Sequence, residues 1–139
     1  MSDQPTSEPV VQSVATPFDQ LGGELAVRAL VDRFYDLMDL EPACAGIRSL
    51  HASILDNARD KLFWFLCGWL GGPNHYIERF GHPRLRARHL PFAIGISERD
   101  QWLACMGQAL ADTGVDAGLA ERLMQSFFST ADFMRNKGG

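Results

Sequence analysis

The residues best suited to chemistry gather between Gly71 and Ile96. Four arginines and three of the chain's four histidines stand in this segment, although the whole chain carries a formal charge of −4. Three prolines interrupt it, so we expect a loop and one short helix that ends near His89 and Leu90. Connections between packed helices usually have about 2–8 residues, and longer ones often carry function. The spacing therefore predicts that the functional site involves this segment.

The spacing of these histidines disfavours a structural zinc site. Zinc ligands stand at short intervals such as C-x2-C, whereas His75, His82 and His89 are seven residues apart and Pro83 interrupts any shared helix. The glycine pairs of the chain lack the G-x-G-x-x-G spacing and the preceding strand of a phosphate-binding loop. We therefore expect neither a zinc cluster nor a nucleotide fold.

The cysteines also give little support to nucleophilic or redox chemistry. Their number is odd and their sequence neighbours are mostly apolar, which keeps a thiol protonated. We expect buried, reduced thiols in a reducing compartment, and no disulfide framework. The three residues are Cys44, Cys67 and Cys105.

A haem site fits His89 better. Haem needs one neutral imidazole for its iron, a flat apolar slot between helices, and cations near its two propionates. His89 stands among apolar residues with Arg86 and Arg88 beside it; alone, it would read as an ordinary surface histidine. Tyr35 and Trp102 lie on the apolar stripes of two other expected helices, so both would direct a polar hydrogen inward, where such donors usually find a partner. A bound dioxygen, which draws negative charge from ferrous iron, would provide that partner.

The apolar periodicity predicts an all-α fold. We expect long helices from Gly23 to the residues before Pro42, over 55–70, from Ser97 onward, and after Gly114, with a short undefined segment over 43–51. Ser97 to Asp100 resembles a capping box. No run alternates in the way of a strand. The clearest stripe consists of Val27, Leu30, Val31, Phe34, Tyr35 and Met38.

Length and charge narrow the class of protein further. The 139 residues predict one domain, and the net negative charge argues against a nucleic-acid binder that relies on bulk positive charge. The N-terminus lacks the basic and apolar regions of a secretory signal. The most apolar run, residues 62–70, is far shorter than the roughly 20 residues of a membrane span. We expect a cytoplasmic protein without membrane or nucleic-acid partners, and a monomer or weak homodimer because no heptad seam is visible.

The stretch GWLGGPNHYIERFGHPRLRARHLPF, residues 68–92, resembles the signature of the group II truncated haemoglobins. RFY at 33–35 and ERDQW at 98–102 fit the same pattern in the same order. The resemblance spans about residues 18–136, which we expect to form a truncated globin domain, while residues 1–17 form a flexible N-terminal extension. It implies a globin-like, 2-on-2 helical sandwich around haem b.

The resemblance implies roles for single residues. His89 matches the proximal iron ligand, Tyr35 the distal tyrosine, and Trp102 the tryptophan whose indole N–H faces the bound ligand. Ala58 takes the place of the distal histidine of vertebrate globins, and Leu62 stands one turn further along.

His51 would be a third polar group above the iron. Here the chain departs from the pattern, because Ala52 replaces the proline that commonly follows this position in relatives. The residues that match propionate contacts are Lys61, Tyr76 and Arg88. The expected lining of the haem slot is Phe65, Leu66, Leu85, Phe92, Ile94 and Met106.

The function that these residues imply is reversible binding of O2 at a pentacoordinate ferrous iron, with CO, NO or peroxide as further ligands and an unidentified reductase as a partner. Haem redox catalysis, with peroxide or with nitric oxide and O2, is the alternative, because a pocket that polarises an oxygen ligand serves both. We expect a ligand-binding protein rather than an enzyme. A haem-free helical interaction domain is the third hypothesis, and it leaves Tyr35, His89 and Trp102 unexplained.

Overall fold

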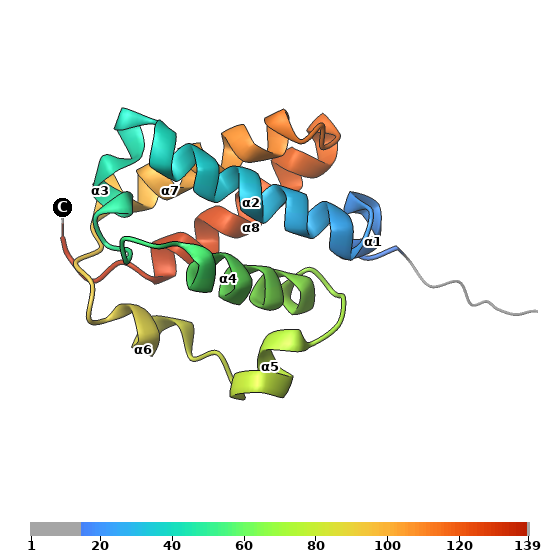
Figure 1. Cartoon of the computed structure of the whole chain (residues 1–139), viewed down its shortest axis with the longest axis horizontal. Helices are drawn as coiled ribbons and strands as arrows, with labels where there is room; N and C mark the ends of the chain where they lie inside the picture. Colours follow the sequence, from blue (N-terminus) through green and yellow to red (C-terminus); the bar gives the residue numbers. More distant parts are fainter. Residues whose placement is uncertain (1–14, 139) are drawn as a thin grey trace, which may run out of the picture.

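A computed structural model describes residues 15–138, so residues 1–14 of the predicted extension lie outside the described part (Figure 1). Every regular element in this range is a helix, which confirms the all-α prediction. The four long helices are α2 (Glu24–Leu40), α4 (Asp56–Trp69), α7 (Ile96–Asp112) and α8 (Ala117–Phe133). The short elements are α1 (Pro17–Leu21), η1 (Pro42–Cys44), α3 (Ala45–Arg48), α5 (His75–Phe80) and α6 (Leu85–His89).

The long helices form two packed pairs. α2 packs against α4, α7 packs against α8, and contact between α2 and α7 joins the pairs (Figure 1). The short helices α5 and α6 lie beyond α4, on the side away from α2. The chain therefore leaves the helical sandwich after α4 and returns to it at α7. The segment between these two helices is the one rich in arginine and histidine.

The core is built on the apolar stripe of α2. All six residues of the predicted stripe are buried, with Tyr35 the most accessible at 5%. The three cysteines are buried and free, as expected. Burial raises the pKa of Cys67 to about 11 and that of Cys105 to about 12, so both thiols stay protonated near neutral pH.

The segment between α4 and α7 holds two short helices, where the sequence indicated one. The missed helix is α5, which begins after Asn74 and ends at Gly81 with φ +78°. Of its six residues only Tyr76 is buried. Such a short element shows no repeated apolar spacing, so periodicity could not reveal it.

The start of α7 also differs from the prediction. The N-cap is Gly95, whose N–H donates to the Glu98 carboxylate at 2.7 Å, and Ser97 lies inside the first turn. A glycine cap carries no side-chain oxygen, so the sequence signal at that position is weaker than that of a serine or an aspartate.

The fold begins slightly before the predicted domain boundary. Thr16 and Asp19 form a capping box: the Asp19 N–H donates to the Thr16 hydroxyl at 3.1 Å, and the Thr16 N–H donates to the Asp19 carboxylate at 3.4 Å. Pro17, which we expected in the extension, is the first residue of α1.

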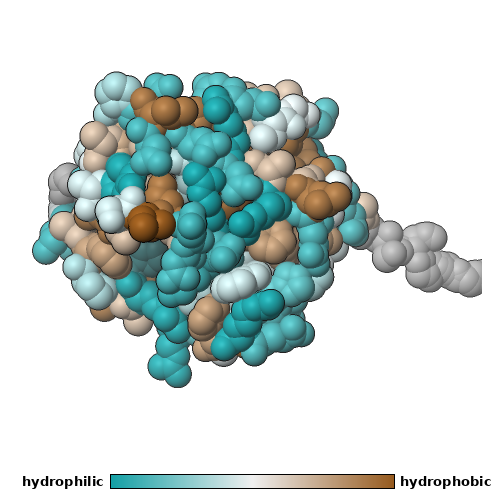
Figure 2. All heavy atoms as spheres, in the orientation of Figure 1, coloured by the Kyte–Doolittle hydropathy of each residue, from teal (hydrophilic) through white to brown (hydrophobic). Residues whose placement is uncertain are grey.

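None of the described helices combines the length and apolarity needed to cross a membrane. The face in Figure 2 is mostly polar, with apolar side chains distributed among charged ones.

Candidate functional site

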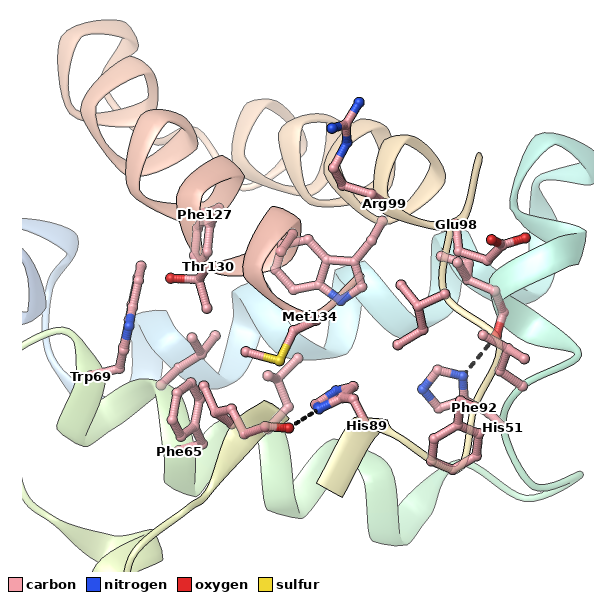
Figure 3. A pocket seen from close by; sticks show the side chains of 18 of the residues that line it. His51, Phe65, Trp69, His89, Phe92, Glu98, Arg99, Phe127, Thr130 and Met134 are labelled. Carbon is pink, nitrogen blue, oxygen red and sulfur yellow. Dashed lines mark hydrogen bonds between the residues drawn. The ribbon is translucent and has the colours of Figure 1, made fainter. Parts of the chain in front are cut away.

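A cavity of about 270 Å³ lies where α6 faces the sandwich, between α2, α3, α4, α7 and α8 (Figure 3). Its wall is predominantly aromatic and aliphatic, with a few polar groups among the apolar ones. Ten of the fifteen residues predicted for the site line it: Tyr35, His51, Leu62, Phe65, Leu66, Leu85, His89, Phe92, Ile94 and Trp102.

His89 is the last residue of α6, and its ring extends into the cavity (Figure 3). Its Nδ1 lies 2.7 Å from the Leu85 carbonyl oxygen. A carbonyl only accepts, so Nδ1 carries the hydrogen, and in the neutral ring Nε2 keeps a free lone pair. Asn136 fixes the backbone from the C-terminal end of the chain, because its Nδ2 donates to the carbonyls of His89 at 3.3 Å and Phe92 at 2.8 Å.

His51 follows α3 and makes the same kind of contact. Its Nδ1 donates to the Ile47 carbonyl at 2.8 Å, and its ring lies nearly perpendicular to that of Tyr35, with the centroids 5.8 Å apart. Burial lowers the pKa of His51 below its usual value, and the positive charge of Arg48 adds to this. His51 is therefore neutral near pH 7, and its Nε2 is a hydrogen-bond acceptor.

Tyr35 and Trp102 bring two donors to the same cavity. Both rings pack on Phe34, with centroid distances of 5.0 and 5.2 Å. Burial raises the pKa of Tyr35, so its hydroxyl stays protonated. Among the described residues, no protein group accepts a hydrogen bond from the Tyr35 hydroxyl or the Trp102 indole. Buried donors rarely stay unpaired, so the cavity is suited to a ligand that accepts hydrogen bonds.

The cavity is also lined by residues that we did not predict for the site from the sequence. Trp69 stacks on Phe127 with centroids 4.8 Å apart, and both rings line the cavity. The lining residues of α8 and its C-cap follow one another at steps of three, one and three, which places them on one face of the helix. The other missed residues are Ile47, Leu50, Glu98, Arg99, Thr130, Ala131 and Met134.

Two predicted apolar residues do not line the cavity. Met106 is fully buried in the core, because the cavity meets only the N-terminal part of α7 and Met106 stands one turn beyond Trp102. Ala58 packs against the core one turn before Leu62, and its single methyl group does not reach the cavity.

The three predicted propionate contacts lie outside the cavity wall. Lys61 is exposed, with its ammonium 5.6 Å from the centroid of the Phe80 ring. Tyr76 is buried and lines a second cavity of about 190 Å³. The Arg88 guanidinium lies 5.8 Å from the centroid of the Tyr76 ring.

Comparison with known proteins extends over nearly the whole described chain. The family of bacterial-like globins matches residues 16–136. The group 2 truncated hemoglobin YjbI of Bacillus subtilis is 38% identical over 126 residues, which cover 91% of this chain and 92% of that protein. The chain belongs to the group II truncated haemoglobins.

Solved structures of such proteins have the same architecture as this truncated haemoglobin. The cold-adapted truncated hemoglobin of Pseudoalteromonas haloplanktis has a TM-score of 0.86 and 41% identity, covering 88% of this chain and 99% of that one. The group II 2-on-2 hemoglobin of Agrobacterium tumefaciens has a TM-score of 0.86 and 39% identity, covering 91% and 98%. The truncated oxygen-avid haemoglobin of Bacillus subtilis has a TM-score of 0.80 and 37% identity, covering 88% and 100%. The predicted globin-like, 2-on-2 fold is confirmed, and membership of a haemoglobin family implies a haem cofactor.

Proposed function

We propose that this truncated haemoglobin holds haem b in the cavity of about 270 Å³ and binds O2 reversibly. The observation that carries the proposal is the convergence of the free Nε2 of His89 with the two unpartnered donors of Tyr35 and Trp102 on one apolar cavity. When bound, haem supplies a ferrous iron that takes O2 reversibly and leaves the ligand with partial negative charge. In this assignment the Nε2 of His89 would bind the iron as its one protein ligand.

The described residues fit haem chemically. A neutral imidazole with a free Nε2 suits iron, and the contact with Leu85 holds that tautomer and the orientation of the ring. The rings of Phe65 and Phe92 and the aliphatic side chains around them offer an apolar slot. Lys61 and Arg88 stand on the two helices that wall the slot, α4 and α6, and neither has a carboxylate partner among the described residues. We assign these cations, with Tyr76, to the propionates.

The donors give this pocket a preference for a polar ligand. The Trp102 indole donates to the ligand, and the Tyr35 hydroxyl donates its one hydrogen either to the ligand or to the Nε2 of the neutral His51 ring. Hydrogen bonds to a charged acceptor contribute about 1.5–3 kcal/mol, and a low-dielectric pocket strengthens them. Leu62 and Leu66 on α4 help to exclude water. These side chains therefore favour O2 over the less polar CO.

An absorption spectrum of the purified protein tests the proposal. We expect a Soret band and the visible bands of a haem protein, and a ferrous form that changes reversibly on addition and removal of O2. A haem-free interaction domain would show neither. A purified protein that takes up no haem from solution would refute the proposal.

One observation favours the alternative function, redox catalysis at the same haem. The free Nε2 of His51 is a base inside the cavity, close to Tyr35, and a base at that place can accept a proton from peroxide. The decisive measurement is peroxide consumption by the parent, by His51→Ala and by His75→Ala, whose histidine contacts Glu24 outside the cavity. Turnover that depends on His51 alone would support catalysis; equal, slow turnover in all three would support ligand binding.

A further inference from the structure

The cations of the described chain divide into two groups. Most arginines on the sandwich pair with carboxylates, for example Arg59 with Asp32 and Asp36 at 3.2 and 2.8 Å. Beyond α4 the pattern changes, because Glu78 is the only carboxylate between residues 71 and 97. In this region Arg79, Arg86 and Arg88 lie over aromatic rings. None of its four arginines has a carboxylate partner among the described residues.

Two of these arginines, with Lys61 of α4 and three rings, form one continuous surface, which we call the aromatic–basic face. Arg79 lies 4.4 Å from the centroid of the Trp64 ring, Lys61 lies 5.6 Å from that of Phe80, and Arg88 lies 5.8 Å from that of Tyr76. The rings join the cations, since Phe80 lies 5.9 Å from Trp64 and 4.8 Å from Tyr76, centroid to centroid.

This face also exposes apolar surface. Ile77 is 49% exposed and Phe80 is 41% exposed. Beside them, Trp64, Tyr76 and Ile77 help to line the second cavity of about 190 Å³. Aromatic and arginine side chains around a recess are typical of protein–protein interfaces, where they contribute much of the binding energy.

The aromatic–basic face is the outer side of the wall of the proposed haem cavity. The Tyr76 ring, which contacts Phe80 outside, lies 6.2 Å from the Phe65 ring, centroid to centroid and edge to face. Phe65 lines both cavities. Two ring-to-ring contacts therefore connect exposed Phe80 with the site, so a protein seated here would lie close to the cavity.

We infer that the aromatic–basic face docks an acidic one-electron donor protein, which keeps the haem in the ferrous state. The inference rests on the proposed function. In the step, the reduced donor loses one electron and ferric iron gains it, and no covalent bond forms or breaks. Charge complementarity favours this partner: in the proposed function Lys61 and Arg88 balance the two propionates, so Arg79 is the cation of this face left to attract an acidic protein, while the whole chain carries a formal charge of −4.

A flavodoxin in its hydroquinone form is a suitable acidic probe, because it gives up one electron to become the semiquinone. The experiment measures its reduction of the ferric protein by stopped flow, for the parent and for Arg79→Glu and Ile77→Asp. The matched control is Arg122→Glu, which has the same charge change. Arg122 donates a hydrogen bond to Gln20 of α1, and α1 lies away from α5 (Figure 1).

At low ionic strength we expect Arg79→Glu and Ile77→Asp to slow reduction roughly five- to tenfold, and Arg122→Glu to change it less than about twofold. At about 0.5 M salt the effect of Arg79→Glu should shrink to less than about twofold, because the charges are screened. NMR of the diamagnetic ferrous CO form provides a readout independent of reduction: oxidised flavodoxin should shift amide signals of α5 and the neighbouring part of α4.

Equal reduction rates in Arg79→Glu and Arg122→Glu, or shifts elsewhere on the chain, would overturn the docking site. Binding to phosphatidylglycerol vesicles through these residues, without any effect of flavodoxin, would overturn it in favour of a lipid surface. In both cases the variants' haem content and spectra stay normal, so the proposed function survives. A parent protein that takes up no haem would instead overturn the proposed function and, with it, this inference.

Discussion

His51 and His89 make the same contact with their own backbone: each ring donates its Nδ1–H to the carbonyl oxygen four residues earlier, at 2.8 Å and 2.7 Å. Each neutral ring therefore leaves Nε2 as its free nitrogen, and both rings line one cavity. The nearby His89 ring also contributes to the lowered pKa of His51, after burial and the charge of Arg48. The Nε2 atoms of His51 and His89 thus both lie at one apolar cavity. Substituting each histidine separately distinguishes their roles.

The first prediction concerns His89. If its Nε2 binds iron, His89→Ala should lose most of the haem or retain it loosely with an altered spectrum, because the remaining retention comes from burial of the porphyrin alone. Haem content per chain and the Soret maximum are the measurements. The control is His82→Ala, which removes an exposed histidine from the same segment. A His89→Ala protein with the parent's haem content and spectrum would show that another group holds the iron.

The second prediction concerns His51. The Ile47 carbonyl holds its ring through Nδ1, and hydrogen bonding to Tyr35 or the ligand requires no large movement of the chain. We therefore expect a five-coordinate, high-spin ferrous spectrum in both the parent and His51→Ala. Loss of one ordinary hydrogen bond should change O2 release by about two- to tenfold.

A low-spin, six-coordinate ferrous spectrum in the parent that disappears in His51→Ala would reverse this assignment. His51 would then be a second iron ligand. His75→Ala serves as the control, since His75 contacts Glu24 at 2.9 Å, outside the cavity.

The third prediction concerns the acid stability of the α7–α8 pair. Asp132 accepts hydrogen bonds from Arg99 at 2.8 Å and from Arg135 at 2.7 Å, and these hold the pKa of Asp132 below its usual value. The unfolded chain therefore binds this proton more readily than the folded one. The stabilisation is present above the unfolded pKa of about 4 and is lost as the pH falls through the lower, folded pKa.

Asp132→Asn should consequently lower the urea midpoint at about pH 7, and the difference from the parent should diminish as the pH falls to about 3. Urea unfolding at both pH values is the measurement. Glu121→Gln, an exposed carboxylate on the same helix, is the matched control for the change in charge. A difference between Asp132→Asn and the parent that is the same at both pH values would contradict the assigned role of the carboxylate.

The parts of the fold that the sequence predicts are those where local pattern and packing agree over several turns. α2 has seventeen residues, and its stripe from Val27 to Met38 repeats often enough to define a buried face. α5 has six residues and makes less than two turns, so no repeat exists to detect. The start of α7 was obscured by a glycine cap, where the relevant hydrogen bond comes from Glu98.

The residues of the site also divide into those that the sequence could predict and those that it could not. His89, Tyr35 and Trp102 could be selected because their chemistry is unusual on apolar stripes, and the structure places all three around one cavity. Phe127 and Met134 also showed helical spacing, but periodicity identifies a face and does not say whether that face meets another helix or a cavity. The prediction that Met106 lines the cavity is wrong for the converse reason. Met106 shares a helix face with Trp102 but lies beyond the end of the cavity.

The last prediction concerns Tyr35 and Trp102 together. Each brings an unpartnered donor to the cavity, and burial raises the pKa of Tyr35 so that its hydroxyl remains a donor at all ordinary pH values. Bound O2 carries partial negative charge, whereas bound CO is nearly neutral. A donor worth about 1.5–3 kcal/mol to a charged acceptor corresponds to roughly a ten- to hundredfold change in rate. Tyr35→Phe should therefore speed O2 release by that factor and leave CO release almost unchanged.

The double variant distinguishes a shared acceptor from two separate contacts. If both donors serve one ligand atom, the remaining donor compensates in part for the lost one, so the single effects should not add. Stopped-flow O2 and CO dissociation from Tyr35→Phe, Trp102→Phe and the double variant measures this. Both rings pack on Phe34, so the phenylalanine substitutions keep an aromatic ring at each position, and CO release reports any general loosening of the pocket. O2 release at the parent rate in all three variants would mean that neither side chain faces the ligand.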